Sequence, residues 1–285
     1  MPAPRISFEV FPPKSLPSSF QLWDTANRLE AFCPEFTSVT YGAQGADKGR
    51  TLDAVKALTD LSDHPVAAHV TALGTSKTDV EDLAHTYSEC GIRHIVALRG
   101  DAPKEGRTQD EYSDSLALTR VLAKRGNFDI SVGAHPNGHP DAASEAQNID
   151  WLKAKLDAGA TQAITQFFFE PDTFLRFRDA CRTAGITAPI IPGVLPIHDW
   201  ALTKNFARKC GIAIPEWLES AFAVAQRDGR DALLSLAVTT ELCSKLVQEG
   251  EDHLHIYTLN RAPLAEALCR ALGKEPTRPA LRNVA

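Results

Sequence analysis

The sequence predicts an α/β fold, a single-domain (β/α)8 or TIM barrel over residues 1–285. Three observations predict this class. Eight short apolar runs typical of buried strands recur at spacings of roughly 30 residues, the length of one βα unit. Segments with helical periodicity lie between these runs along the whole chain. No linker rich in glycine and serine divides the sequence, so we expect one closed barrel.

The expected strands share period-two alternation or continuous runs of Val, Ile and Phe. They begin near Ile6, Phe36, Pro65, His94, Asp129, Gln162, Pro189 and His253. The helices expected after the first seven cover residues 16–32, 51–61, 78–90, 111–124, 142–158, 172–184 and 199–210. Residues 215–227 and 231–249 precede the last strand, and we expect one inserted helix and the usual outer helix there. The predicted barrel therefore has an extra helix between strands seven and eight.

A doubly wound open sheet is the alternative for the same alternation of strands and helices. Such sheets usually carry a glycine-rich first turn. Neither G-x-G-x-x-G nor G-x-x-x-x-G-K-[ST] occurs in the sequence, so neither a Rossmann nor a P-loop phosphate site is supported. The closed barrel is therefore the favoured class.

The composition is that of a globular protein, with 44% hydrophobic and 23% charged residues. A formal net charge of -6 gives no overall positive field for nucleic acid or an anionic membrane, so we expect a small-molecule partner. The six cysteines are scattered singly, which predicts neither a zinc ribbon nor a disulfide framework. No apolar stretch approaches the roughly 18 residues that span a bilayer, and we expect a cytoplasmic protein.

Glu9 is a carboxylate within the apolar run of residues 6–11. Pro12 and Pro13 end this run, because proline cannot donate to a strand ladder. Alternation places Phe8 and Val10 on one face of the strand and Glu9 on the other. Partial desolvation would raise the pKa of Glu9 and leave it protonated near neutrality, which is the state a general acid needs. The alternative is an ordinary glutamate on a half-exposed edge strand.

Polar residues stand at the expected C-terminal ends of nearly all strands, where a barrel of this class carries its chemistry. In chain order they are Glu9; Thr40, Tyr41 and Gly42; His69 with Thr71; Arg99, Gly100 and Asp101; His135 with His139; Gln166; Asn260 and Arg261. No lysine lies within the expected strands, so a Schiff-base mechanism is not indicated.

We expect no catalytic metal. His135 and His139 are four residues apart, but Pro136 and Gly138 favour a loop, and no carboxylate cluster accompanies them. His253 and His255 share a strand face, but they lie at the beginning of the strand, which is the stability face of a barrel.

Two of these strand ends have alternative interpretations. Arg99 and Asp101 could form a plain ion pair at a loop. Alternatively, Arg99 donates to a phosphate or a ring edge while Asp101 places negative charge beside a bound ring. Gln166 carries an amide that can contact the edge of a heterocycle, and we assign the three phenylalanines after it, residues 167–169, to packing on alternate faces.

Six contiguous motifs, in the same order, make the chain resemble the bacterial methylenetetrahydrofolate reductases, a family of flavoproteins. They are SFEVFPP (7–13), SVTYGA (38–43), GIRHIVALRGD (91–101), AITQFFF (163–169), IPGVLP (191–196) and YTLNRA (257–262). The resemblance implies a barrel that holds non-covalent FAD at its C-terminal mouth. NADH or NADPH would reduce the flavin and leave, and methylenetetrahydrofolate would then bind at the same face. NADH is favoured, and a homodimer or homotetramer is implied.

The resemblance also implies roles for single residues. Glu9 resembles the acid that protonates the folate so that its five-membered ring opens, and Asp101 the group whose charge stabilises cationic folate. The implied FAD contacts are Thr40, His69, Arg99, Gly100, Asp101, His135, His139 and Lys155. The implied substrate contacts are Gln166, Phe206 and Arg261. Alternatively, Lys155 is a solvated helix residue and His69 a satisfied core histidine.

Three positions depart from the pattern of the family. His135 stands in place of a tyrosine, Asn148 in place of an acidic flavin contact, and Leu202 in place of a substrate-side glutamine. Histidine keeps a flat ring that can stack on a flavin. The other two changes remove a charge and a polar contact, and they keep open the alternative of a relative that binds folate or works without flavin.

Overall fold

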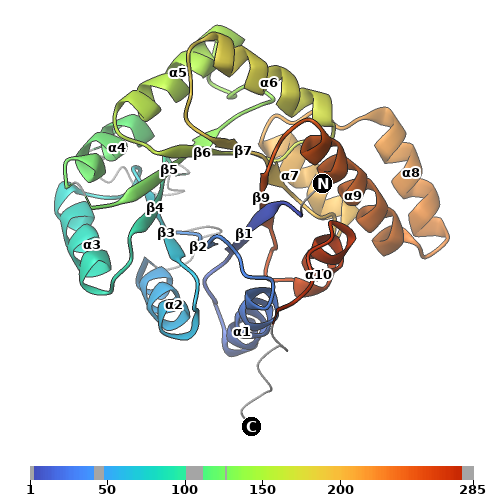
Figure 1. Ribbon diagram of the computed structural model, residues 1–285, viewed down its shortest axis with the longest axis horizontal. Helices are drawn as coiled ribbons and strands as arrows, with labels where there is room; N and C mark the ends of the chain where they lie inside the picture. Colours follow the sequence, from blue (N-terminus) through green and yellow to red (C-terminus); the bar gives the residue numbers. More distant parts are fainter. Residues whose placement is uncertain (1–2, 42–47, 101–111, 126, 278–285) are drawn as a thin grey trace.

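The computed structural model describes residues 3–41, 48–100, 112–125 and 127–277. It shows a ring of parallel strands surrounded by helices (Figure 1). Asp101, one of the expected site residues, lies outside the described residues. The prediction of one domain over the full range 1–285 is not tested and stays a prediction.

The strands follow the predicted starts within one residue. They are β1 (Arg5–Val10), β2 (Thr37–Val39), β3 (Val66–Thr71), β4 (His94–Leu98), β5 (Asp129–Ala134), β6 (Gln162–Thr165), β7 (Ile190–Ile191), β8 (Gly193–Val194) and β9 (His253–Tyr257). The predicted seventh strand is divided at Pro192, which has no N–H to donate, into β7 and β8.

The sheet closes through this divided strand. β7 pairs with β6, β8 pairs with β9, and β9 pairs with β1. Consecutive strands from β1 to β6 pair in parallel around the rest of the ring. The prediction of a closed barrel is confirmed, and the open doubly wound sheet is excluded.

Helices follow the strands and form the outer layer of Figure 1. They are α1 (Leu16–Glu30), α2 (Lys48–Leu61), α3 (Lys77–Glu89), α4 (Ser115–Ala123), α5 (Glu145–Asp157), α6 (Pro171–Thr183), α7 (Trp200–Lys209), α8 (Glu216–Arg227), α9 (Asp231–Gln248) and α10 (Ala262–Ala271). The insertion expected before the last strand is α8, between α7 and α9. Helix α10 was not among the expected helices.

Short polar side chains fix where several helices begin. Asp114 accepts a hydrogen bond from the backbone N–H of Ala117 at 2.8 Å, and Asp199 accepts one from that of Leu202 at 2.9 Å. These bonds satisfy donors that the first turn of a helix leaves unpaired. These two bonds therefore hold the chain at the entrances to α4 and α7.

The two faces of β1 separate packing from chemistry. Phe8 and Val10 point outward and are almost fully buried against the helices, whereas Ser7 and Glu9 point into the barrel. The interior is filled midway by an apolar cluster of Phe36, Ala67, Val96, Ile164 and Ile191. Polar side chains lie at both ends of this cluster.

The three consecutive phenylalanines alternate as predicted. Phe167 and Phe169 contact each other, whereas Phe168 stacks on Phe174 of α6 in a different cluster. In the part of the chain that the structure describes, no helix is long and apolar enough to cross a membrane.

Candidate active site

Glu9 lies at the C-terminal end of β1 and faces the barrel interior. Its neighbours in the ladder are Ser38 of β2 and Tyr257 of β9. Because β1 is paired on both sides, the alternative of an exposed edge strand is wrong. The Glu9 side chain is 16% exposed, and burial raises the pKa of its carboxyl, opposed by His69.

Two histidines face the Glu9 carboxyl. Nε2 of His69 lies 3.5 Å and Nε2 of His255 lies 4.0 Å from Glu9 Oε2. Neither nitrogen has a hydrogen-bond partner among the described residues. Burial lowers the pKa of His69 to about 4 and that of His255 to about 3, so both rings are neutral near pH 7.

The arrangement is therefore a carboxyl whose pKa is raised by burial, beside two neutral imidazoles. The interpretation of His69 as a satisfied core histidine is wrong, because its Nε2 is buried without a partner in the described chain. A buried carboxyl that keeps its proton near neutrality can deliver that proton to a bound molecule.

Sequence reasoning missed two residues of this site, His255 and Tyr257. His255 was expected at the stability face, but it reaches Glu9 because β9 lies directly beside β1. The Tyr257 hydroxyl donates to the backbone oxygen of Thr165 at 2.6 Å, and burial followed by the nearby Glu9 raises its pKa. In a closed barrel the last strand pairs with the first. Applying this rule to the sequence would have placed His255 and Tyr257 beside Glu9.

Gly193 provides the space for Tyr257. A Cβ at this position would lie 2.7 Å from the Tyr257 hydroxyl and would collide with the backbone oxygen of Thr165. The interruption of the seventh strand at Pro192 and the glycine after it thus allow the tyrosine to lie across the sheet.

Asn260 holds the end of β1 in place. Its side-chain oxygen accepts from the Phe11 N–H at 2.7 Å, and its side-chain nitrogen donates to the Phe11 carbonyl at 2.9 Å. The backbone of Asn260 is left-handed, with a φ of 54°, a conformation that asparagine tolerates better than most residues. Asn260 is therefore a positioning residue for the segment that follows Glu9.

The ends of β2 and β4 supply further groups at this mouth. Thr40 Oγ1 is buried with no hydrogen-bond partner in the described ranges, while its carbonyl accepts from Thr51 Oγ1 at 3.1 Å. Gly100 has a φ of 81°, and a Cβ there would lie 2.8 Å from Thr71 Cβ. A side chain at position 100 would therefore push the ends of β3 and β4 apart.

Aromatic rings gather after β5. The His135 and His139 rings lie 4.7 Å apart, and the ring of His139 lies 5.4 Å from that of Trp151, both edge to face. Burial, with smaller effects of His139 and Lys155, lowers the pKa of His135 to about 3. As predicted, the two histidines lie in a loop.

Lys155 reaches this group from α5. Its Nζ donates to the carbonyl of Gly133 at 2.5 Å, and burial lowers its pKa to about 8. The alternative of a freely solvated helix lysine is therefore wrong. Asn148, also on α5, donates to the carbonyl of His135 at 2.8 Å. An ionised carboxylate at position 148 could not donate this bond, so the amide fixes the loop instead of adding a charge.

Arg99 pairs with a residue that the sequence did not single out. Its Nη1 lies 2.6 Å from Asp141 Oδ2, with both side chains about half exposed, and this bond lowers the pKa of Asp141. The alternative ion pair with Asp101 concerns a residue outside the described chain. The Arg99 side chain is 48% exposed, so the guanidinium stands at the rim of the barrel.

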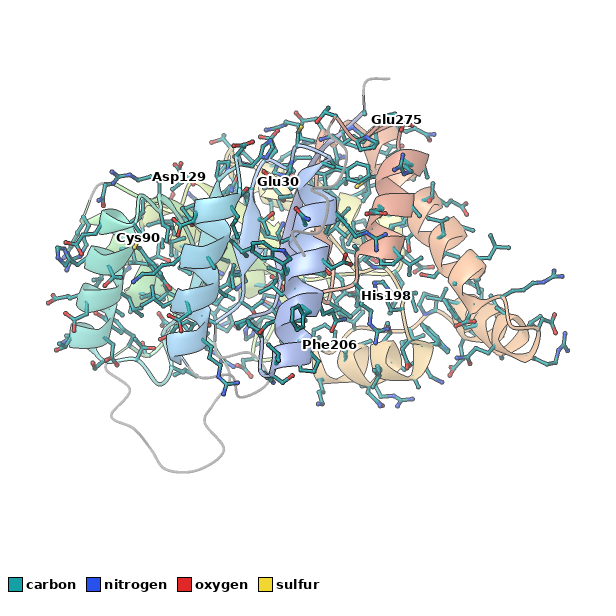
Figure 2. The ribbon with its side chains drawn as sticks, turned by 90° about the horizontal axis from the view of Figure 1, so that it is seen from below. Glu30, Cys90, Asp129, His198, Phe206 and Glu275 are labelled. Atoms are coloured by element: carbon teal, nitrogen blue, oxygen red, sulfur yellow. The ribbon has the colours of Figure 1, made fainter. Side chains whose placement is uncertain are left out.

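The expected substrate contacts lie on the far side of the mouth. Gln166 is turned back on its own chain, since its oxygen accepts from the Phe167 N–H at 3.0 Å. Phe206 of α7 stacks on Phe167, with ring centroids 5.2 Å apart, and is 43% exposed. In Figure 2, Phe206 and His198 lie at one end of the barrel, opposite the end that carries Asp129.

Arg261 occupies the N-cap position of α10, without a side-chain capping bond, and is exposed. Burial, with a smaller effect of Arg261, lowers the pKa of His198 to about 4. Leu202 is exposed on α7, and it offers no polar group to a ligand there. Within the described residues, no group of three or more metal-ligating side chains is present.

The structure thus brings together Glu9, His69 and Thr40, adds His255 and Tyr257, and gathers His135, His139 and Lys155 as a second group nearby. Fold and site together define a TIM-barrel enzyme with a buried acid at its C-terminal mouth. The sequence matches the family described as methylenetetrahydrofolate reductase over residues 2–273. The chain belongs to the methylenetetrahydrofolate reductase family, and its activity is that oxidoreductase activity of one-carbon metabolism.

Individual relatives agree with the family. The 5,10-methylenetetrahydrofolate reductase of Pectobacterium carotovorum is 39% identical over 273 residues, which cover 95% of this chain and 91% of that protein. The enzyme of the same name from Escherichia coli K12 is 39% identical over 274 residues, 95% of this chain and 92% of that protein. The resemblance stated from the six motifs is confirmed.

Solved structures support the fold alone. An uncharacterized protein from Clostridium thermocellum that binds two copies of 5-methyl-5,6,7,8-tetrahydrofolic acid superposes with a TM-score of 0.69 at 14% identity. The match covers 95% of this chain and 94% of that one. The likeness confirms the barrel class.

Proposed function

We propose that the reduction proceeds as a ping-pong cycle at the C-terminal mouth, with FAD bound non-covalently. NADH or NADPH occupies the mouth first, and 5,10-methylenetetrahydrofolate then takes the same place and leaves as 5-methyltetrahydrofolate. The single observation that carries this proposal is the buried Glu9 carboxyl between two neutral imidazoles. This group is suited to the folate half of the cycle, which consumes a proton.

The residues at the mouth fit a flavin. Thr40 Oγ1 is a buried polar atom without a partner in the described chain, and a ligand could satisfy it. Arg99 presents donors at the rim, and Lys155 is a cation kept in place by Gly133. The residues that would hold FAD are Thr40, His69, Arg99, Gly100, Asp101, His135, His139 and Lys155. When bound, FAD supplies the group that carries a hydride from the nicotinamide to the folate.

Glu9 moves the proton of the folate half-reaction. Its carboxyl gives a proton to a nitrogen of the folate's five-membered ring, the carbon–nitrogen bond of that nitrogen breaks, and the methylene carbon becomes a cationic acceptor for hydride. Glu9 is left as a carboxylate. One proton and one hydride are thereby added to each folate. Asp101 remains the residue expected to stabilise the cationic folate.

The opposite side of the mouth would receive the substrates. Phe206 offers an exposed ring on which an aromatic group can stack, and Arg261 an exposed cation. Gln166 would have to release its bond to the Phe167 N–H before its oxygen could contact folate. These three residues stay predicted substrate contacts.

Further properties stay predictions. We propose NADH as the preferred reductant, because the sequence shows no basic cluster suited to a 2′-phosphate. A homodimer or homotetramer is expected from the resemblance to the family. A cytoplasmic location is expected because the sequence has no apolar stretch long enough to span a bilayer.

The test is to measure the two half-reactions separately by stopped-flow absorption. In Glu9→Gln, we expect folate reduction to fall by about 10²- to 10⁴-fold while reduction of the flavin by NADH stays near the wild-type rate. Glu35→Gln is a matched control, because Glu35 lies at the other end of the barrel beside Arg5. Equal loss of both half-reactions would contradict the role of Glu9.

The competing function is a folate-binding relative that works without flavin. The absorption spectrum of the freshly purified protein separates the two. We expect flavin bands, or their appearance after FAD is added. A colourless protein that neither binds FAD nor oxidises reduced nicotinamide would overturn the proposed function.

A further inference from the structure

The proposed function leaves Glu9 as a carboxylate after every turnover, so the residue must recover a proton each time. The folate and the cofactor would cover the C-terminal mouth while Glu9 reacts. The barrel interior behind Glu9 therefore becomes the region in which to look for another route. The need for such a route rests on the proposed function of Glu9.

A line of hydrogen-bonding groups runs from Glu9 toward the N-terminal end of the barrel. His255 Nε2 faces Glu9 at 4.0 Å, and its other ring nitrogen, Nδ1, shares a hydrogen bond of 2.7 Å with Ser7 Oγ. Ser7 Oγ shares a second bond, of 3.0 Å, with Nε2 of His253. These three side chains lie on adjacent strands, β1 and β9, whose inward faces are in register.

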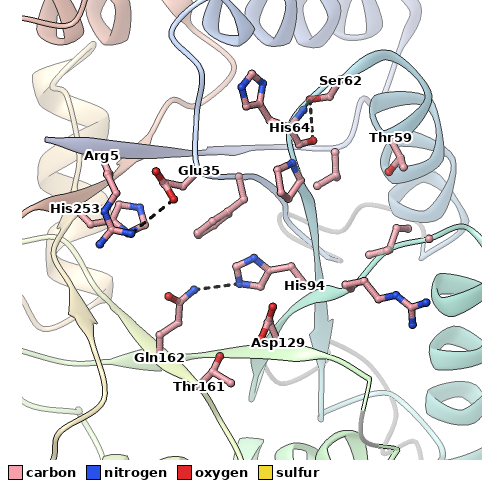
Figure 3. Close-up of a pocket in the computed structure, with 16 residues that line it drawn as sticks. Arg5, Glu35, Thr59, Ser62, His64, His94, Asp129, Thr161, Gln162 and His253 are labelled. Atoms are coloured by element: carbon pink, nitrogen blue, oxygen red, sulfur yellow. Dashed lines mark hydrogen bonds and ion pairs between the residues drawn. The ribbon is translucent and has the colours of Figure 1, made fainter. Parts of the chain in front are cut away.

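The line ends at a cavity. His253 lines a cavity of about 590 Å³ at the N-terminal end of the barrel, shown in Figure 3. Arg5 and Glu35 lie at its edge and are 51% and 40% exposed, so the cavity is open to solvent. His253 itself is buried, as are Ser7 and His255. The line therefore joins solvent at one end of the barrel to the acid at the other.

We propose that His253, Ser7 and His255 form a proton path along the barrel interior, through which solvent in the N-terminal cavity reprotonates Glu9. His253 is the residue at which protons enter this path. These three are positioning and relay groups, and of the four residues from His253 to Glu9 only Glu9 contacts the folate.

The transfer balances without any redox change. His253 Nδ1 takes a proton from solvent, while its Nε2 passes one to Ser7 Oγ. Ser7 passes its own proton to His255 Nδ1, and His255 Nε2 gives one to Glu9 Oε2. Only N–H and O–H bonds form and break, and one proton enters for each that arrives. The last step requires the Glu9 carboxyl to rotate toward His255, because 4.0 Å exceeds hydrogen-bond distance.

The surroundings keep the rings neutral, as a relay of this kind needs. Burial is the main cause that lowers the pKa of His253 to about 3, and His255, Arg5 and His94 act in the same direction against Asp252. His255 faces Glu9 and stacks on Phe36, and burial lowers its pKa to about 3. Each ring can therefore accept a proton at one nitrogen only as it releases one at the other.

Kinetics separate this path from the role of Glu9. In His253→Leu, Glu9 is still protonated at the start, so the first folate reduction should keep the wild-type rate. Later turnovers should slow by about tenfold or more, giving one rapid equivalent followed by a slow steady state. Glu9→Gln would lack the first equivalent as well, so failure of the path and failure of the proposed function are distinguishable.

His94→Gln is the matched control. His94 lines the same cavity and packs against Phe36, but it bonds to Ser131 instead of Ser7. We expect its steady state to stay within twofold of wild type. A His253→Leu enzyme with wild-type steady state, or one that loses the first equivalent as well, would overturn the path. Added imidazole should restore turnover to His253→Gly, and thiazole, a far weaker base of similar size, should not.

A readout without cofactor or substrate tests the hydrogen-bond line itself. In ¹⁵N NMR spectra of the protein free of FAD, Ser7→Ala should shift Nδ1 of His255 and Nε2 of His253 together. In the same spectra, His94→Gln should shift these two signals much less than Ser7→Ala does, because His94 bonds to Ser131 and not to Ser7. Displacement of neither signal, or of only one, by Ser7→Ala would show that the line is broken and would contradict the path.

Discussion

The two ends of the barrel interior hold similar side chains in opposite conditions. At the N-terminal end, His94, Ser131 and Gln162 bond to one another at 2.8 to 3.2 Å, as Figure 3 shows in part. At the C-terminal end, His69 Nε2 and Thr40 Oγ1 are buried with no hydrogen-bond partner among the described residues. The same chemical groups are satisfied at one end and unsatisfied at the other.

The presence of unpaired buried polar groups identifies the functional end of the barrel better than the volume of a cavity does. An unpaired buried polar group costs about 1–3 kcal/mol, so a fold keeps several together only where a ligand completes them. The N-terminal cavity is large, at about 590 Å³, but the histidines and amide around it are bonded to their neighbours. The family's chemistry lies instead at the mouth where Glu9 is found.

Asn260→Ala should show the largest effect on stability. At the C-terminal end of the barrel, the Asn260 side chain makes two hydrogen bonds to the backbone of Phe11. Its loss would leave the N–H and the carbonyl of Phe11 without their partner, at about 1–3 kcal/mol for each group. We expect the free energy of unfolding to fall accordingly in denaturant titrations. An unchanged unfolding midpoint would show that β1 needs no clamp after Glu9.

His94→Leu should come next and act at the satisfied end. Its loss leaves Ser131 Oγ with one bond fewer and should lower the free energy of unfolding by about 1–3 kcal/mol. We expect folate reduction to stay within twofold of wild type. A variant that loses activity and keeps its stability would contradict the assignment of His94 to the structural end of the barrel.

Glu9→Gln should change how stability depends on pH. The pKa of Glu9 is raised above its ordinary 4.5 in the folded state, so the native protein holds this proton longer than the unfolded chain does. Wild-type stability is therefore lost as pH rises above 4.5, by up to about 1.4 kcal/mol per unit until the folded pKa is passed. The variant should be the more stable protein at neutral pH and equal to wild type below about pH 4. The reverse order at neutral pH would contradict the burial of a neutral carboxyl.

His69→Leu is the counterpart of the His94 variant and should have the smallest effect on stability. Because His69 Nε2 is unpaired, its removal should leave the free energy of unfolding within about 1 kcal/mol of wild type or raise it. Folate reduction should nevertheless slow. A large loss of stability, equal to that of His94→Leu, would remove the distinction between the two ends.

The spacing of apolar runs was enough to predict the barrel, because each βα unit must bury one strand and one helix locally. The predicted starts near Gln162 and His253 coincide with the observed ones. The division of the seventh strand at Pro192 was not predicted. It follows from the missing N–H of proline and from the need to pair with β6 and β9 in turn.

Site residues could be predicted where a polar side chain stands at the end of its own apolar strand. They could not be predicted where the contact is made by a residue distant in the sequence. Glu9 and His69 were found because each is a polar group at the end of an apolar run. His255 was missed because its neighbour Glu9 is 246 positions away, on the first strand, beside which the last strand lies. The pairing of Arg99 with Asp141 was missed because it depends on how a loop folds back.

The central claim is that burial keeps Glu9 protonated near neutrality, and infrared spectroscopy tests it most directly. The measurement is the difference spectrum between wild type and Glu9→Gln at about pH 7, before any folate is added. We predict the carbonyl stretching band of a protonated carboxylic acid in wild type that is absent from the variant. A spectrum in which only carboxylate bands differ would show that Glu9 is ionised and would contradict the account.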